Sequence, residues 1–217
     1  MGRTRRHAVK PGASASARTK GAQGPWLQDI PNLVYRQGDR LVTTPRQAFD
    51  LNHLALPSLD GLKEVAAQEG HVWIEASRAC NSRCVFCSRH PVRATRWTLV
   101  PAFRVAQAMR LYHRTCGITH FRFTDDDFMG TGMAEGAHHA RAIARHIQDQ
   151  GLGVTFDFSA RVESVFAQKA SETDNRQKTA TYALLKEAGL TQVYLGIESG
   201  SPSQLKRFGK RATLQEN

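Results

Sequence analysis

Three of the four cysteines in the chain lie close together, and their spacing could place them around one metal centre. Cys80, Cys84 and Cys87 form the pattern C-x3-C-x2-C directly after an expected β-strand. Thiolates are soft ligands that suit iron–sulfur clusters, zinc or copper(I). An iron–sulfur cubane has four irons to ligate, so three cysteines would leave one iron open to bind and activate another molecule.

A nearby histidine allows a different interpretation of the same loop. His90 follows Cys87 with two residues between them, so a structural zinc site of three cysteines and one histidine fits the spacing equally well. Cys116 is different, because it lies on the apolar face of an expected helix, just before Gly117. We interpret Cys116 as a small buried hydrophobic residue.

Polar residues follow the other expected strands as well. Thr124 precedes three adjacent carboxylates, Asp125, Asp126 and Asp127. Since adjacent carboxylates repel one another, this strand end predicts a bound cation, a ligand rich in donors, or water. The alternative is a polar loop in which one aspartate caps the next helix.

The third and fourth expected strands also end in residues that could bind a ligand. Arg161 could hold a carboxylate with its two-pronged guanidinium, or it could be a solvated rim residue. Glu198, within the Gly-rich stretch 196–201, could accept hydrogen bonds from hydroxyl or amino groups. A parallel sheet would bring all these strand ends to one rim.

The elements that would position these residues alternate in type. Glycines 117, 151 and 189 each follow a segment with helical spacing and precede a β-rich run, as helix-ending glycines do. The three helical faces are Val105, Met109, Tyr112 and Cys116; Ala140, Ile143, Ala144 and Ile147; and Thr181, Leu184, Leu185 and Ala188. With a first strand at 72–74, this order predicts right-handed crossovers and a parallel sheet, either open or TIM-like. We interpret the polar stretch 171–178 as a surface insertion beside the third helix.

The 217 residues are divided by composition into three parts. Residues 1–24 are predicted to be a disordered basic tail, residues 25–70 an extension with a hairpin turning at Gly38, and residues 71–217 the core. Of the net charge of +11, a large part lies in the tail, which we interpret as solvated rather than as a nucleic-acid contact or a transit peptide. No apolar run is long enough for a membrane span. Clustered cysteines favour a reducing, cytoplasmic location.

Three stretches of the core resemble the radical S-adenosylmethionine (radical SAM) superfamily. Residues 80–87 resemble its C-x3-C-x-aromatic-C loop, and residues 123–128 resemble its F-x-D-D-x-F strand. Residues 184–190, 194–201 and 205–206 resemble its L-x-x-A-G, G-x-E-S-G-S and L-K segments. The resemblance covers residues 71–217 and favours an iron–sulfur cluster over zinc.

The resemblance implies an α/β fold, a partial TIM-like (β/α) barrel of the radical SAM type with about four βα units and an irregular N-terminal extension. Cys80, Cys84 and Cys87 would bind three irons of a 4Fe–4S cluster, and SAM would chelate the fourth. An electron from a reductant such as flavodoxin or ferredoxin would cleave SAM to methionine and a 5′-deoxyadenosyl radical. That radical would abstract hydrogen from an unknown substrate.

The resemblance also implies which residues contact SAM. Phe86 would lie near the adenine, Arg161 would meet the carboxylate, and Glu198 or Ser199 would meet the ribose hydroxyls.

Residues 124–126 occupy the place of the family's Gly-Gly-Glu motif. Thr124 would be one of the SAM-binding residues, and either Asp125 or Asp126 would accept hydrogen bonds from the SAM amino group.

Within the superfamily, the chain looks most like the cobalamin-binding branch. Residues 31–36 with Gly38 resemble the connector after the cobalamin domain, but residues 1–30 are too short for that domain. The stretch from Asp50 to His53 also does not match the D-x-H-x-x-G signature of a cobalamin site. Use of cobalamin as a cofactor, and methyl transfer as the reaction, are therefore one option among others for this chain.

Because the family's barrel has more units than the sequence supplies, we expect a chain truncated at its C-terminus. Two alternatives to a radical SAM enzyme, or its N-terminal part, stay open. One is a basic zinc-binding module for nucleic acid, built on Cys80, Cys84, Cys87 and His90, although we expect no nucleic-acid partner. The other is an inactive remnant with the fold alone.

Overall fold

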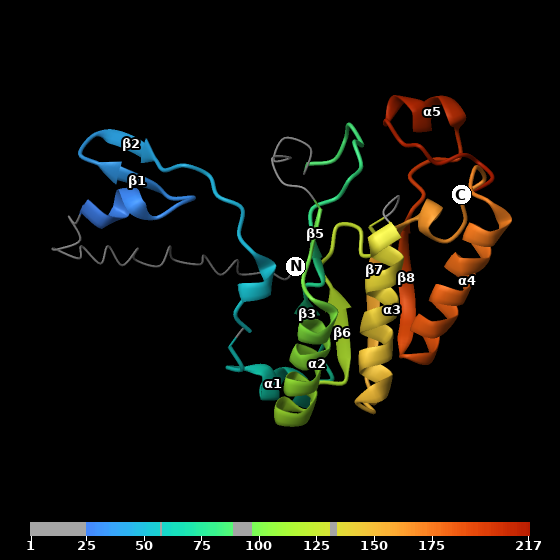
Figure 1. Cartoon of the computed structure of the whole chain (residues 1–217), viewed down its shortest axis with the longest axis horizontal. Coiled ribbons are helices and arrows are strands. Elements are labelled where there is room, and N and C mark those ends of the chain that lie inside the picture. Colours follow the sequence, from blue (N-terminus) through green and yellow to red (C-terminus); the bar gives the residue numbers. More distant parts are fainter. Residues whose placement is uncertain (1–24, 57, 89–96, 131–133) are drawn as a thin grey trace, which may run out of the picture. The chain divides into compact units, whose positions relative to one another are not determined.

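The computed structural model describes residues 25–56, 58–88, 97–130 and 134–217 (Figure 1). The chain forms two compact units that divide between Ala48 and Phe49. The predicted basic tail, residues 1–24, lies outside the described residues, and the predicted limits of the extension and the core stay predictions. Among the described residues, no helix is both long enough and apolar enough to cross a membrane.

The first unit contains the hairpin that the sequence predicts. The 3-10 helix η1 (Pro25–Asp29) precedes β1 (Val34–Gln37), which pairs antiparallel with β2 (Arg40–Thr43). Gly38 lies in the turn with φ +60°, a conformation that glycine adopts without strain. The hairpin at Gly38 is confirmed.

The second unit is built around a four-stranded parallel sheet in the order β3-β6-β7-β8. Its elements are η2 (Leu51–His53), α1 (Leu62–Ala67), β3 (Val72–Ile74), β4 (Ser77–Arg78), β5 (Thr98–Leu99), α2 (Ala102–Cys116), β6 (His120–Phe123), α3 (Ala134–Asp149), β7 (Thr155–Arg161), η4 (Val162–Ser164), α4 (Glu172–Glu187), β8 (Leu190–Gly196) and α5 (Pro202–Arg207). Strands β4 and β5 form a separate antiparallel pair. The predicted α/β fold with parallel strands and intervening helices is confirmed, and it is consistent with a partial barrel.

The helices cover one face of this sheet, as Figure 1 shows for α2, α3 and α4. Alternate residues of a strand point to opposite faces, and the helix-facing set is aromatic. Phe121, Phe123, Phe156 and Phe158 are almost completely buried and join the helices in one core. Cys116 belongs to the same core, which confirms its interpretation as a buried hydrophobic residue.

The predicted helix-ending glycines are present at the predicted places. Gly117 ends α2 with φ +78°, and Gly151 follows α3 with φ +58°. Gly189 has φ +113°, and a Cβ there would lie 2.2 Å from the carbonyl oxygen of Val154. The turn from α4 into β8 therefore requires glycine both for its backbone angle and for space.

The interpretation of residues 171–178 as a surface insertion was wrong, because Ser171 caps α4 and residues 172–178 form its first half. The Ser171 side chain accepts a hydrogen bond from the Asp174 amide, and the Asp174 side chain accepts one from the Ser171 amide. This capping box fixes the start of the helix. The stretch is polar because this half of α4 is largely exposed to solvent.

The other face of the sheet carries a charged network. Asp157 of β7 is buried and accepts hydrogen bonds from the side chains of Arg122 and His120 on the adjacent strand β6. The Arg122 guanidinium lies 5.4 Å from the ring centre of Trp73 and 5.1 Å from that of Tyr194. One buried carboxylate thus connects β6 to β7, and its arginine partner reaches β3 and β8.

Candidate active site

The carboxyl ends of the parallel strands open into a cavity of about 630 Å³. All predicted site residues line it except Asp125 and Ser199. The predicted site residues that line the cavity are Cys80, Cys84, Phe86, Cys87, Thr124, Asp126, Arg161 and Glu198. The expectation that successive strand ends share one rim is therefore met.

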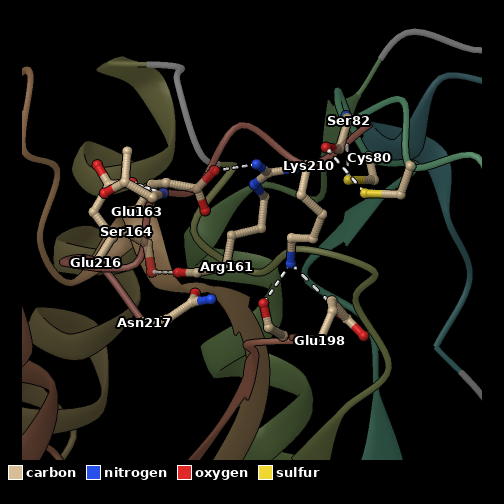
Figure 2. Close-up of polar contacts among 12 residues, drawn as sticks. Cys80, Ser82, Arg161, Glu163, Ser164, Glu198, Lys210, Glu216 and Asn217 are labelled. Carbon is tan, nitrogen blue, oxygen red and sulfur yellow. Dashed lines mark hydrogen bonds and ion pairs between the residues drawn. The ribbon is translucent and has the colours of Figure 1, made fainter. Parts of the chain in front are cut away.

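The cysteine loop forms one wall of the cavity. Cys80, Cys84 and Cys87 are half-buried free thiols. The Ser82 amide donates a hydrogen bond to Cys80 Sγ at 3.4 Å, and Ser82 Oγ lies 3.6 Å from Cys84 Sγ (Figure 2). Burial raises the pKa of the Cys80 thiol, and the hydrogen bond from Ser82 offsets this only in part. A bound metal would reverse that cost, because it binds the thiolate form.

The donor chemistry of this loop is compatible with an iron–sulfur cluster. Within the described residues, no three His, Cys, Asp or Glu side chains converge on the position of a single ion. A cubane binds each cysteine through a different iron, so its ligands do not need to meet at one point. His90, the fourth ligand of the zinc alternative, lies outside the described residues.

The two candidate aspartates after β6 have different environments. Asp125 is buried, and its carboxylate accepts hydrogen bonds from the Ala76 amide at 3.0 Å and from the Ser77 hydroxyl at 2.5 Å. Burial raises the pKa of Asp125 to about 7, although both hydrogen bonds oppose the shift. Asp125 therefore connects β6 to the segment that leads into the cysteine loop, whereas Asp126 lines the cavity.

Arg161 is held at the end of β7 by a carboxylate that the sequence analysis did not identify. Its guanidinium donates a hydrogen bond to Glu163, and both side chains are largely buried (Figure 2). Burial alone would lower the pKa of Arg161, but the hydrogen bond and charge of Glu163 raise it above its ordinary value. Arg161 therefore presents a fixed positive charge to the cavity that it lines.

Glu198 follows β8 in a strained conformation and is paired with a lysine. Its φ of +65° is uncommon for a residue other than glycine. The Lys210 ammonium lies 3.5 Å from Glu198 Oε1 and donates a hydrogen bond to the Gly196 carbonyl (Figure 2). Lys210 is buried and lines the cavity too, so Glu198 and Lys210 form an ion pair in its wall.

The segment after α5 is fastened to the cysteine loop. The Val85 amide donates a hydrogen bond to the Phe208 carbonyl at 2.9 Å. The rings of Phe86 and Phe208 meet edge to face, with centres 5.0 Å apart. Gly209 has φ +68°, and a Cβ there would lie 3.1 Å from the Arg83 carbonyl oxygen. Phe86 is thus held at the cavity by a segment distant in the sequence.

Ser199 is the second predicted residue that does not line the cavity. Its amide donates a hydrogen bond to the Ile197 carbonyl, and its hydroxyl accepts one from the Ser201 amide. Its carbonyl accepts a hydrogen bond from the Asn217 side chain. The first two contacts lie in the turn between β8 and α5, and the third joins this turn to Asn217.

Two proteins of known sequence are similar to the chain. Over 170 residues it is 32% identical to 4′-phospho-dehydrooxetanocin synthase of Priestia megaterium, a match that covers 74% of this chain and 22% of that protein. Over 201 residues it is 28% identical to the uncharacterised methyltransferase PH0819 of Pyrococcus horikoshii, covering 90% and 40% respectively. The chain thus spans less than half the length of either relative.

Solved structures are similar as well. The cobalamin-dependent radical SAM enzyme OxsB, with aqua-cobalamin and SAM bound, has a TM-score of 0.76 and 27% identity, covering 88% of this chain and 27% of that one. The radical SAM methyltransferase TsrM of Kitasatospora setae has a TM-score of 0.60 and 17% identity, covering 87% and 37%. The likeness to TsrM shows the fold alone.

The model of one protein family matches most of the core. Its description is the Radical SAM superfamily, and the match covers residues 74–217. This range includes the cysteine loop, all four strand ends that line the cavity, and the segment that carries Lys210. The chain therefore belongs to the Radical SAM superfamily.

Proposed function

We propose that the chain binds a 4Fe–4S cluster through Cys80, Cys84 and Cys87 and, as part of a radical SAM enzyme, cleaves SAM reductively. The observation that carries the proposal is the shared cavity, where a loop of three free thiols faces a fixed arginine and a carboxylate ion pair. When bound, the cluster would supply one electron to the sulfonium of SAM, yielding methionine and a 5′-deoxyadenosyl radical. The family match favours this function over a zinc-binding nucleic-acid module.

Arg161 is the proposed partner of the SAM carboxylate. A guanidinium has five N–H donors in a rigid fork that suits a carboxylate. Glu163 accepts one of these hydrogen bonds and fixes the direction of the fork, so Arg161 can bind a second carboxylate with little loss of side-chain freedom.

Asp126 is the proposed acceptor for the SAM ammonium group, with Thr124 beside it. Both line the cavity. The buried carboxylate of Asp125 is engaged by Ala76 and Ser77, which supports a positioning role for Asp125. It would fix the end of β6 against the start of the cysteine loop.

Glu198 is the proposed acceptor for the ribose hydroxyls, and Phe86 the proposed contact for the adenine. The ion pair with Lys210 holds Glu198 at the cavity, whereas the hydrogen bonds of Ser199 are with Ile197, Ser201 and Asn217. Of the two candidates, Glu198 and Ser199, we therefore assign the ribose hydroxyls to Glu198. Phe86 is half-exposed at the cavity, and a planar ring there can stack on a purine.

The relatives support a more specific proposal for the complete reaction, in which cobalamin is a second cofactor and methyl transfer is one option. OxsB is described as cobalamin-dependent, and PH0819 as a methyltransferase. The test is to add cobalamin to the cluster-loaded chain and measure its absorption spectrum after gel filtration. Co-elution would support cobalamin use, and complete separation would count against it for this chain.

The test of the proposed function is anaerobic reconstitution with iron and sulfide, followed by metal analysis. We expect about four irons per chain and a brown protein. Cys84→Ala should lose the iron, because it removes a ligand, while His90→Ala should retain it. One equivalent of zinc, lost in both variants, would contradict the proposal and support the zinc alternative.

A further inference from the structure

The cysteine loop is bordered by a basic surface, which we call the basic rim. It consists of Arg83 from the loop and Lys206, Arg207 and Arg211 from α5 and the turn after it, all of them exposed. We propose that the basic rim is the docking surface for an acidic one-electron carrier protein of the flavodoxin type. The inference rests on the proposed function, since reductive cleavage of SAM needs an electron from outside the chain.

The contacts of the loop with the segment after α5 place the rim next to the cysteines. Phe208, between Arg207 and Gly209, bonds to the Val85 amide, and Gly209 lies against the Arg83 carbonyl. Val85 and Cys84 are adjacent in the sequence. Arg83 and Arg207 therefore belong to the two backbone segments that meet beside Cys84, so the rim borders the cysteine loop.

The charge of the rim is not neutralised by its surroundings. Residues 199–215 contain no Asp or Glu, and within the described part of the chain none of the four rim cations forms an ion pair. The acidic residues on either side are engaged elsewhere, Glu198 by Lys210 and Glu216 by the amides of Gln168 and Thr213. The rim therefore presents a positive potential that attracts an acidic surface.

The rim also includes an exposed apolar residue. Val85 is 62% exposed and lies next to Phe86, whose ring packs on Phe208. Protein interfaces combine a buried apolar centre with a polar rim, and electron-transfer complexes are small and short-lived. An exposed apolar side chain next to the rim cations gives this surface the same kind of composition.

The step that this surface would serve is a single electron transfer. The reduced carrier loses one electron and the cluster gains it, and no bond forms or breaks at the interface. Electrostatic attraction acts mainly on the association rate, and salt screens it. The proposal therefore predicts a rate that depends on ionic strength and on the rim charges.

The experiment is anaerobic stopped-flow mixing of the cluster-loaded chain with fully reduced flavodoxin at several salt concentrations. The double variant Arg207→Glu/Arg211→Glu should reduce the second-order rate about 10-fold at low salt and remove most of its salt dependence. The matched control is Arg110→Glu/Arg114→Glu, which makes the same charge change on exposed positions of α2. That control should keep a rate close to the wild-type rate.

A neutral reductant separates this inference from the proposed function. Photoreduced 5-deazariboflavin should reduce the cluster equally in all three proteins, because it does not depend on docking. Equal flavodoxin rates in the rim variant and the wild type, or an equal loss in the α2 control, would overturn the inference and leave the proposed function standing. Failure of the wild-type chain to take up iron would instead contradict the proposed function.

Direct binding keeps the inference testable even without a cluster. Oxidised flavodoxin should bind the cluster-free chain in low salt, and the rim variant should weaken that binding several-fold. No difference between the rim variant and the α2 control would overturn the inference. Salt-sensitive RNA binding that is lost in the rim variant, with flavodoxin binding unchanged, would overturn it in favour of a nucleic-acid partner.

Discussion

The ammonium group of Lys210 lies 3.5 Å from a carboxylate oxygen of Glu198 and donates a hydrogen bond to the carbonyl of Gly196. Gly196 ends β8, whereas Lys210 follows the segment that is fastened to the cysteine loop. A Cβ at Gly196 would lie 2.8 Å from Glu198 Oε1. The proposed ribose acceptor and the proposed cluster loop are thus held by one short segment.

Replacing Lys210 should therefore weaken SAM binding without removing the cluster. In Lys210→Met, Glu198 loses its ion pair while keeping its strained φ, and we expect the Kd for SAM to rise about 10-fold. Lys206→Met is the matched control, since Lys206 is exposed and does not line the cavity. Equilibrium binding of SAM to the reconstituted chain measures the Kd, and iron analysis shows whether the cluster is retained. Unchanged affinity in Lys210→Met would contradict the role of the ion pair.

Asp125 should make folding stability depend on pH. Its pKa is about 7 in the folded chain against an ordinary value of 3.8, so between these values the folded state holds a proton that the unfolded state has lost. The free energy of unfolding should therefore fall as pH rises from about 4 to 7, by on the order of a few kcal/mol.

Asp125→Asn removes this titration while keeping the size of the side chain. The stability of the variant relative to the wild type should increase from pH 5 to pH 8. Urea unfolding of the cluster-free proteins at both pH values measures the difference in their free energies of unfolding. Parallel changes in both proteins would show that Asp125 does not carry the dependence.

The buried carboxylate of Asp157 makes Arg122 important for stability. Among the described residues, Arg122→Leu would leave His120, at 2.9 Å, as the one side chain that hydrogen-bonds to Asp157. Removing the partner of a buried carboxylate is destabilising, so Arg122→Leu should lower the free energy of unfolding. Arg145→Leu, at an exposed position of α3, should change the free energy of unfolding by less than about 0.5 kcal/mol. Similar values for the two variants in urea unfolding would contradict the role of the network.

The elements that sequence reasoning predicted are those with local signals. The glycines at 117, 151 and 189 mark helix ends because a positive φ restricts which residue can occupy such a position. The spacing of Cys80, Cys84 and Cys87 is visible because all three lie on one loop. Such features need no knowledge of distant parts of the chain.

The features that sequence reasoning missed depend on contacts between distant segments. Lys210 lies among other basic residues, and only the docking of the segment after α5 distinguishes it from a solvated lysine. Asp125 and Asp126 are adjacent, and the choice between them depends on Ser77, 48 residues earlier. Glu163 had a local signal, since it follows Arg161 by two residues, but either residue could equally have been solvated.

The central claim is that this cavity binds SAM at an open iron of the cluster. Its most direct test is the EPR spectrum of the reconstituted, reduced chain recorded with and without SAM. The account predicts a cluster signal whose shape changes when SAM is added, because SAM would become a ligand of the cluster, and a smaller change in Arg161→Ala. A cluster signal that is identical with and without SAM would contradict the claim.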